Sequence, residues 1–295
     1  MRSIFSNIYN IVSLFQFTVF VLISFLFHFM NFNFTIAQQV YSSNYFNKEA
    51  MYSKIELNDE LREISGLAVS DDDRVFCHND EHGIIFQIDP ENGKIINQFY
   101  LGRKIIQGDF EGIAIAGLKF FMVSSSGDIY EFEEGNDGER VEYKIHNTGL
   151  SSKSNVEGLC YDIVTNSLLL ACKEKPGKKY KDFRAVYSFS LRTNKLNDEP
   201  YLLINLKELQ TKLGIEEFYP SGIEISNDKN SFFLISSKGK PAVIEIDRKS
   251  NILFAKNLNK KKHNQPEGIS FLKDYSLLIS DEGGKGKSVL SRYKK

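Results

Sequence analysis

Three glutamates occupy the same position in a short segment that occurs five times along the chain. Each copy has a Ser or Glu, then Gly, then Leu or Ile. The residues before the five glycines are Ser65, Glu111, Glu157, Ser221 and Glu267. If the fold gathers these positions around one axis, the three carboxylates repel one another in a partly dry environment. A hard cation would relieve that repulsion.

Calcium suits such a site because Ca²⁺ accepts about 6–8 oxygen ligands with flexible geometry. We therefore expect a Ca²⁺ site in which Glu111, Glu157 and Glu267 are ligands. The alternative is that these Glu and Ser side chains form hydrogen bonds between neighbouring repeats. The sequence leaves both interpretations open.

A second oxygen-rich set stands at the ends of the strands that follow these segments. It comprises Asn79, Asp80, Ser125, Glu174, Ser237, Asp281 and Glu282. From this set we take Asn79 and Asp281 as further candidate metal ligands. His and Cys are scarce in both sets, and this disfavours zinc and copper.

Catalysis would require a general base beside the metal. Only His78, next to Asn79 and Asp80, stands where it could face the mouth of a central channel. The sequence contains no Gly-x-Ser-x-Gly elbow, P-loop or Cys-x-x-Cys pair. A packed or surface histidine is the simpler interpretation of His78, so no catalytic residue is assigned.

The elements that must position these residues are β-strands in a repeating unit. Gly66, Gly112 and Gly158 are 46 residues apart, Gly222 follows 64 residues later, and Gly268 another 46. Each unit contains runs of alternating apolar residues separated by Gly, Asn or Asp turns, which predict antiparallel meanders. Four strands in about 46 residues is the size of a propeller blade. We therefore predict an all-β fold, a five-bladed β-propeller of four-stranded blades.

The sequence also predicts how the ring closes and which elements the extra residues of the third repeat form. The last repeat ends after its third strand, and residues 52–57 form an isolated strand before the first repeat. We expect this N-terminal strand to supply the outer strand of the last blade, because this hides two sheet edges. The expected outer strands of the other blades are residues 94–101, 139–146, 199–204 and 251–258. The third repeat adds a basic hairpin at 173–184 and a short helix within 205–218.

The N-terminus differs in composition from the rest of the 295 residues. A basic residue, an apolar run over residues 11–34 and a small-x-small site ending at Ala37 are typical of a secretory signal. The run is long enough for an uncleaved membrane anchor as the alternative. We therefore expect a signal peptide or membrane anchor at 1–37, a linker at 38–51 and the propeller at 52–295. The propeller would be exported, either periplasmic or anchored outside the cytoplasm.

Overall charge argues against a nucleic-acid partner. The formal net charge is -1, and acidic and basic residues are mixed along the chain. Binding phosphates requires clustered Lys and Arg, and the short basic run at 260–263 is expected to be a solvated loop. The three cysteines Cys77, Cys160 and Cys172 are too few for a disulfide scaffold and are expected to be buried thiols.

The repeated motifs resemble the SdiA-regulated (YjiK-like) family of bacterial exported propellers. The matching segments are Ser-Gly-Leu at 65–67, Asp-Phe-Glu-Gly-Ile at 109–113, Glu-Gly-Leu at 157–159, Lys-Glu-Lys at 173–175, Ser-Gly at 221–222 and Gln-Pro-Glu-Gly-Ile at 265–269. The resemblance covers about residues 53–295. It implies five blades, a bound calcium ion and a distant relation to NHL-repeat propellers, but no reaction.

Two functions follow from these expectations. The first is a non-enzymatic, calcium-containing scaffold of the cell envelope that binds a protein, glycan or small-molecule ligand, with the membrane involved only through the N-terminal segment. The alternative is a calcium-dependent hydrolase that acts on an ester, lactone or phosphoester at the channel mouth. A deep acidic pocket with His78 at its rim would favour the hydrolase, and a channel plugged by apolar side chains would favour the scaffold.

Overall fold

A computed structural model describes residues 19–24, 45–46, 51–174, 176 and 178–294. The contacts divide the chain into one unit over Met1–Asn44 and another over Tyr45–Lys295. Residues 19–24 are helical. The rest of the predicted signal or anchor at 1–37, and most of the linker at 38–51, lie outside the described residues. No helix in the described part is long and apolar enough to cross a membrane.

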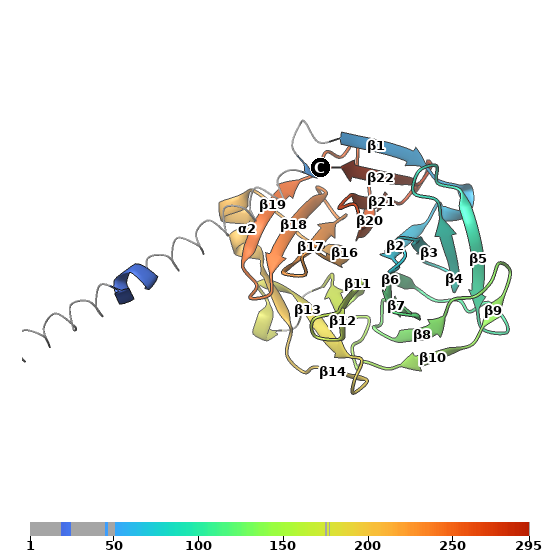
Figure 1. Ribbon diagram of the computed structural model, residues 1–295, viewed down its shortest axis with the longest axis horizontal. Helices are drawn as coiled ribbons and strands as arrows, with labels where there is room; N and C mark the ends of the chain where they lie inside the picture. Colours follow the sequence, from blue (N-terminus) through green and yellow to red (C-terminus); the bar gives the residue numbers. More distant parts are fainter. Residues whose placement is uncertain (1–18, 25–44, 47–50, 175, 177, 295) are drawn as a thin grey trace, which may run out of the picture. The chain divides into compact units, whose positions relative to one another are not determined.

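The described strands between Met51 and Lys294 form five sheets, each built on antiparallel pairing, arranged as blades around an axis, which confirms the predicted propeller (Figure 1). The five motif segments form the inner strands β2 (Ile64–Val69), β6 (Phe110–Ala116), β11 (Val156–Asp162), β16 (Pro220–Ile225) and β20 (Pro266–Phe271). The second strands are β3 (Val75–Asn79), β7 (Lys119–Ser124), β12 (Ser167–Cys172), β17 (Ser231–Ser236) and β21 (Leu277–Asp281). The third strands are β4 (Ile84–Ile88), β8 (Ile129–Glu133), β13 (Phe183–Ser190), β18 (Ala242–Asp247) and β22 (Val289–Lys294).

The outer strands of blades 2 and 3 differ from the ranges expected at 139–146 and 199–204. In blade 2 the expected strand at 139–146 divides into β9 (Arg140–Val141) and β10 (Tyr143–His146). Strand β9 pairs in parallel with β5 (Ile95–Leu101), the outer strand of blade 1. Strand β10 pairs with β8 in its own blade. In blade 3, β14 (Lys195–Leu196) and β15 (Leu202–Asn205) both pair with β13. Blade 4 has a single outer strand, β19 (Ile252–Asn257). Glu142 alone separates β9 from β10, and residues 197–201 separate β14 from β15.

The last blade receives its outermost strand from the other end of the propeller sequence. Strand β1 (Met51–Glu56) pairs antiparallel with β22, with Tyr52 opposite Tyr293 and Glu56 opposite Val289. Just before this strand, Tyr45 and Phe46 are buried in the apolar cluster between blades 4 and 5. The Tyr45 hydroxyl donates to the Tyr275 carbonyl at 2.7 Å.

Five separate apolar clusters fill the five gaps between adjacent blades. Leu278 and Leu290 of the last blade, for example, pack with Cys77 and Phe86 of the first. Burying apolar surface between blades contributes roughly 25 cal/mol per Å² to the free energy of folding, so each of the five interfaces stabilises the ring. The three cysteines are buried free thiols, as expected.

The long third repeat has the predicted helix at its end. Helix α2 (Leu206–Leu213) begins at Asn205, whose side chain accepts from the Glu208 amide, and ends at Gly214 in the left-handed region. Its buried Leu209 joins the cluster between blades 3 and 4. The basic hairpin contains the short 3-10 turn η2 (Lys178–Tyr180), and another such turn, η1 (Asp59–Leu61), precedes β2.

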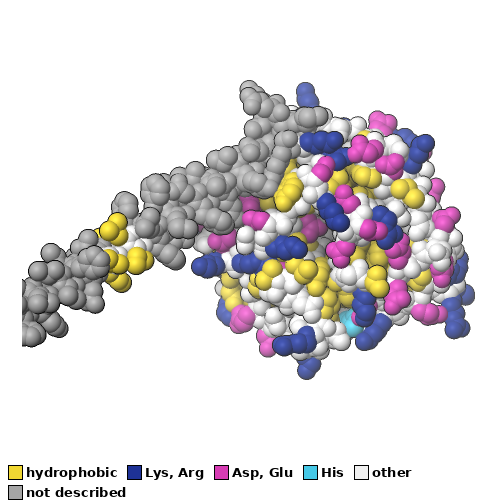
Figure 2. Space-filling model, viewed as in Figure 1, with side chains coloured by type: hydrophobic (Ala, Val, Ile, Leu, Met, Phe, Trp, Pro, Cys, Tyr) yellow, Lys and Arg dark blue, Asp and Glu magenta, His cyan; other side chains and the backbone are white. Residues whose placement is uncertain are grey.

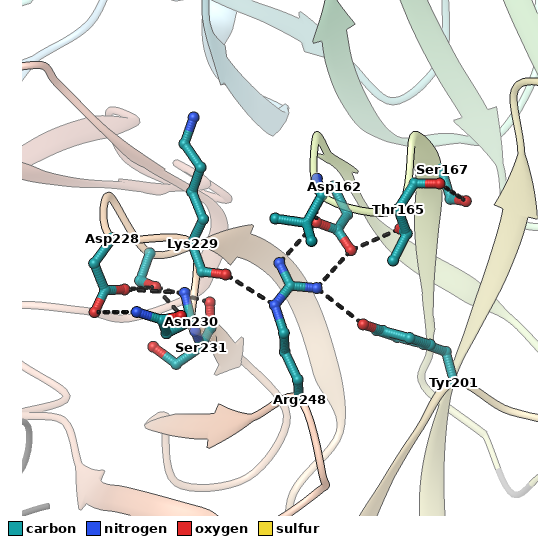
Figure 3. A network of polar contacts seen from close by, with 11 residues as sticks. Asp162, Thr165, Ser167, Tyr201, Asp228, Lys229, Asn230, Ser231 and Arg248 are labelled. Atoms are coloured by element: carbon teal, nitrogen blue, oxygen red, sulfur yellow. Dashed lines mark hydrogen bonds and ion pairs between the residues drawn. The ribbon is translucent and has the colours of Figure 1, made fainter.

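Arg248 forms a polar clamp between blades 3 and 4 (Figure 3). Its guanidinium donates to both carboxylate oxygens of Asp162 at 2.8 Å, to the Tyr201 hydroxyl at 2.9 Å and to the Lys229 carbonyl at 2.8 Å. Burial alone would raise the pKa of the Asp162 carboxyl, but the hydrogen bonds from Arg248 and Thr165 hold it below its usual value. The buried carboxylate therefore depends on Arg248 for its charge balance.

Arg248→Met should destabilise the protein by about 3–5 kcal/mol, because it leaves the buried Asp162 carboxylate without its cation. Urea unfolding of the full-length chain measures the loss. Arg192→Met removes an exposed arginine and should change the free energy of unfolding by no more than about 0.5 kcal/mol. Equal effects of the two substitutions would contradict a stabilising clamp.

Glu245 should make the protein less stable as the pH rises. Its carboxyl is 3% exposed, and burial raises its pKa to about 7. The folded state therefore holds a proton that the unfolded chain releases near its ordinary pKa of 4.5, so this stabilisation is complete below pH 4.5 and is lost as the pH rises through 7. Unfolding measured from pH 4.5 to 8 should show a shallower decline for Glu245→Gln than for the natural protein. The exposed Glu216→Gln should leave the decline unchanged.

Candidate acidic site at the propeller axis

The five inner strands approach one another so closely at the axis that only glycine fits at the motif position. A Cβ atom added to Gly112 would lie 2.7 Å from the Leu159 amide nitrogen, and one on Gly222 would lie 2.7 Å from the Glu267 carbonyl oxygen. Real Cβ atoms essentially never approach closer than 3.0 Å. The motif glycines are therefore explained by the contact between neighbouring blades.

A register shift occurs at the same place in all five inner strands. In each strand the pairing with its neighbour is interrupted at the residue before the glycine. Such bulges bend a strand and change the direction of a side chain, and they are common beside functional sites. Here they occur at the positions of Glu111, Glu157 and Glu267.

The three glutamates converge on a small cavity at the axis. The cavity has a volume of about 10 Å³ and is lined by the five glycines, by these glutamates and by the apolar residue after each glycine, whose side chain packs in a cluster between blades. The apolar residues are Leu67, Ile113, Leu159, Ile223 and Ile269. Because a single water molecule needs about 10–15 Å³, the cavity can hold one atom-sized species beside the carboxylates.

Burial and mutual repulsion make the three carboxylates hard to ionise together. Burial, and then the Glu157 charge, raise the pKa of Glu111 to about 8. Burial also raises the pKa of Glu267 well above its usual value, with Glu157 and Glu111 adding to the effect. Burial raises the pKa of Glu157 as well, although the nearby Lys173 ammonium opposes this shift.

Lys173 is the cation that faces this acidic group. Its ammonium donates to Glu157 Oε1 at 2.9 Å, and the Asn155 side chain donates to the same oxygen at 2.6 Å. The lysine charge lowers the pKa of all three carboxyls. Sequence reasoning placed Lys173 in the basic hairpin and missed this role, although it directly follows β12, the strand paired with β11.

The two serines at the equivalent positions join adjacent blades. The Ser65 hydroxyl donates to the Glu111 carbonyl at 3.3 Å, and the Ser221 hydroxyl donates to the Pro266 carbonyl at 2.6 Å. Hydrogen bonds between neighbouring repeats are thus present at both serine positions, and the Glu267 side chain adds one to Ser237 of blade 4. The three glutamates also lie close enough at the axis to act on one another electrostatically.

The other two candidate ligands lie away from this cavity. Asn79 Oδ1 accepts from the His82 amide at 3.2 Å in the turn after β3. Asp281 is buried against His263, whose Nδ1 lies 2.8 Å from Asp281 Oδ2, and its other oxygen accepts from the Gln265 amide. His263 also contacts the Tyr293 hydroxyl, so Asp281 belongs to a polar cluster inside the last blade.

The His78 side chain packs beside Gly66 of the inner strand and does not face solvent. It is fully buried, and its Nδ1 donates to the Asn79 carbonyl at 2.8 Å. Its Nε2 would lie 2.8 Å from a Cβ on Gly66 and has no hydrogen-bond partner among the described residues. Burial lowers the pKa of the imidazole to about 4, so His78 is neutral at physiological pH.

Further acidic residues surround the axial group on the same face. Burial and the Glu63 carboxylate raise the pKa of Asp80, and burial and Asp80 raise that of Glu282. Elsewhere charges of both signs are interspersed over the face shown in Figure 2. Among the described residues, no three or more His, Cys, Asp or Glu side chains are arranged as a completed metal site. The axial glutamates thus form an acidic, oxygen-rich group that lacks the geometry of a preformed chelate.

The arrangement defines the class of protein as a β-propeller with an acidic axial site. No protein-family model matches the chain, and no curated protein matches it. Solved structures do resemble it. A luciferin-regenerating enzyme matches with a TM-score of 0.53 and 9% identity, over 83% of this chain and 95% of its own. The glutaminyl cyclase of Myxococcus xanthus matches with a TM-score of 0.53 and 11% identity, over 83% and 96%.

These likenesses concern the fold alone, because the identities are so low. Both matching proteins are enzymes by name, so the fold does not distinguish a binding protein from a catalyst. Function must be argued from the site.

Gly112→Ala should destabilise the protein by about 1–3 kcal/mol, because the new methyl group overlaps the Leu159 backbone of the next blade. Thermal unfolding of the full-length chain measures the effect. Gly286→Ala is the matched control, since its nearest atom would be 3.5 Å from the new Cβ. A Gly112→Ala protein as stable as the control would mean that the inner strands are less tightly packed than described.

Proposed function

We propose that the protein is an exported binding propeller of the SdiA-regulated (YjiK-like) family that holds Ca²⁺ at its axis. The single observation that carries the proposal is the convergence of Glu111, Glu157 and Glu267 on one small cavity. All three belong to motifs on which the family resemblance rests. The fold agrees with what that resemblance implies.

Charge balance supports a divalent ion. Three ionised carboxylates and the Lys173 ammonium leave two negative charges, which one Ca²⁺ would neutralise. The raised pKa values of Glu111 and Glu267 reflect the energetic cost of that excess charge. Carboxylate oxygens are ligands that Ca²⁺ prefers, and its flexible coordination tolerates contributions from water and carbonyls. Bound calcium would supply a fixed positive charge at the centre of the face.

Two observations favour binding over hydrolysis. The axial cavity has a volume of about 10 Å³, which leaves no room for a substrate. The histidine expected as a general base is fully buried behind Gly66. A protein, glycan or small-molecule ligand would therefore contact the face around the axis, and calcium would act there as a structural or ligand-contacting ion.

The N-terminal sequence supports location outside the cytoplasm. A signal peptide would release the propeller into the periplasm, and an uncleaved anchor would hold it at the membrane. In both cases the propeller meets a compartment in which calcium is available to a site of moderate affinity.

Calcium should raise the melting temperature of the natural protein, and a chelator should lower it again. Glu157→Gln should abolish this response, because it removes one carboxylate from the axial group. Glu142→Gln, an exposed substitution, should leave the response intact. Differential scanning calorimetry of protein purified without added ions provides the measurement. Identical melting curves with Ca²⁺ and with chelator would overturn the calcium proposal.

A further inference from the structure

All five turns between the inner and second strands open on one face of the propeller, which we call the turn face. Three large aliphatic side chains are exposed there: Leu118 is 87% exposed, Ile163 51% and Val164 61%. Leu118 stands between β6 and β7, and Ile163 and Val164 stand between β11 and β12, so they belong to neighbouring blades. A group of exposed aliphatic side chains on one face indicates an interaction surface.

Polar contacts fix the backbone of the turn that carries Ile163 and Val164. The Val164 amide donates to Asp162 Oδ1 at 3.1 Å, and the Thr165 hydroxyl donates to Asp162 Oδ2 at 2.7 Å. The Arg248 clamp holds the same carboxylate in place (Figure 3). The two aliphatic side chains are therefore presented to solvent by an ordered turn.

The turn of blade 2 is as short as a hairpin allows. Ala116 pairs with Lys119, so Gly117 and Leu118 alone form the turn. Gly117 has a φ of +63°, which suits a two-residue hairpin turn, and a Cβ atom there would have nothing within 4 Å. Leu118 therefore projects from the turn face into solvent.

Positive charge lies beside the apolar turn of blade 3. The Leu191 amide donates to the Asn166 carbonyl at 3.1 Å, which brings the turn after β13 next to the turn after β11. Arg192 and Lys195, at this second turn, are exposed and form no ion pair with the described residues. Aliphatic side chains flanked by Lys and Arg are typical of segments that lie among lipid headgroups.

The turns of blades 4, 5 and 1 are polar and bond to one another on the same face. The Asn227 side chain donates to the Leu272 carbonyl at 3.1 Å, and the Lys273 amide donates to Asp73 Oδ1 at 2.9 Å. These turns satisfy polar groups within the protein. The exposed aliphatic side chains of the turn face are thus gathered on blades 2 and 3.

The chain enters the propeller at the turn face. The Tyr45 hydroxyl donates to the carbonyl of Tyr275, which belongs to the turn between β20 and β21. Tyr45 is eleven residues beyond the end of the apolar run at residue 34, and eleven extended residues span at most about 40 Å. An uncleaved N-terminal anchor would therefore keep the turn face close to the membrane surface.

We propose that the turn face is a membrane-contacting surface, in which Leu118, Ile163 and Val164 insert into the headgroup region of the bilayer that holds the N-terminal anchor. This inference rests on the location that the proposed function assigns, and not on calcium. It adds a second membrane contact to the one expected of the N-terminal segment. The axial glutamates, near the beginning of the inner strands, would then lie on the side away from the bilayer.

A short tether makes a weak contact sufficient. The strength of interfacial binding scales with the apolar area that is buried, and three aliphatic side chains bury little area on their own. A tether keeps this face at a high effective concentration beside the bilayer. The contact would therefore orient the propeller without adding an irreversible attachment.

The first experiment uses tryptophan as a probe, because the sequence contains none. The full-length chain is reconstituted into vesicles of phosphatidylcholine with brominated acyl chains, which quench tryptophan fluorescence within the bilayer. Leu118→Trp and Val164→Trp should be quenched several times more strongly than Leu213→Trp. Leu213 is the matched control, because it is also an exposed leucine and lies on α2, which follows the end of β15 away from the turn face.

A second substitution tests whether the aliphatic side chains make the contact. Ile163→Asp, added to Leu118→Trp, should reduce the quenching severalfold, because a charged side chain is costly to place in the bilayer. Leu213→Asp, added to the same Leu118→Trp protein, should leave the quenching unchanged. Both positions are exposed, and thermal unfolding verifies that each variant is folded.

The results distinguish this inference from the proposed function. If the chain stays with the vesicles but Leu118→Trp and Val164→Trp are quenched no more than Leu213→Trp, membrane contact by the turn face is overturned and the proposed location stands. If the natural chain leaves the vesicles in a high-salt wash, N-terminal anchoring and this inference both fall. The melting experiment with Ca²⁺ and chelator decides the calcium proposal separately.

Discussion

The close approach of five inner strands at one axis is the constraint on which the rest of the structure depends. Neighbouring backbones come so near at the motif position that a Cβ atom on Gly112 would overlap the next strand. The same crowding interrupts the strand pairing one residue earlier in all five blades. The residues that precede the five glycines are therefore brought close together. Because three of them are glutamates, the fold places three like charges near one another.

The repulsion among these charges lowers the stability of the fold, so other interactions must offset it. Five apolar clusters hold the blades together at larger radius, and polar contacts such as the Arg248–Asp162 clamp join individual pairs. The parallel pairing of β9 with β5 also joins blades 1 and 2. Stability is thus concentrated between the blades, which leaves the axis free to hold groups that would destabilise a smaller protein.

Much of this could be predicted from sequence, because the repeat spacing and the strand periodicity report local structure. The glycine spacing predicted five blades. Because Glu111, Glu157 and Glu267 occupy the same position in the repeat, their convergence could also be predicted. Contacts that depend on loop geometry were not predictable. Lys173 lies in a basic hairpin and turns inward to Glu157, whereas Asp281 turns to His263. Residues 139–146 divide between two blades at the single residue Glu142, and the strand-like sequence on either side gave no signal of this break.

The same position in the repeat serves two purposes, and the choice between them limits the charge at the axis. Ser65 and Ser221 are short enough to donate to the carbonyl of the next blade, and they add no charge. The longer glutamates reach the axial cavity. A glutamate at all five positions would place five carboxylates around about 10 Å³, a repulsion that the single Lys173 ammonium could not offset. Three carboxylates beside one lysine repel one another less than five would, so the two serines are as much a part of the site's electrostatics as the glutamates.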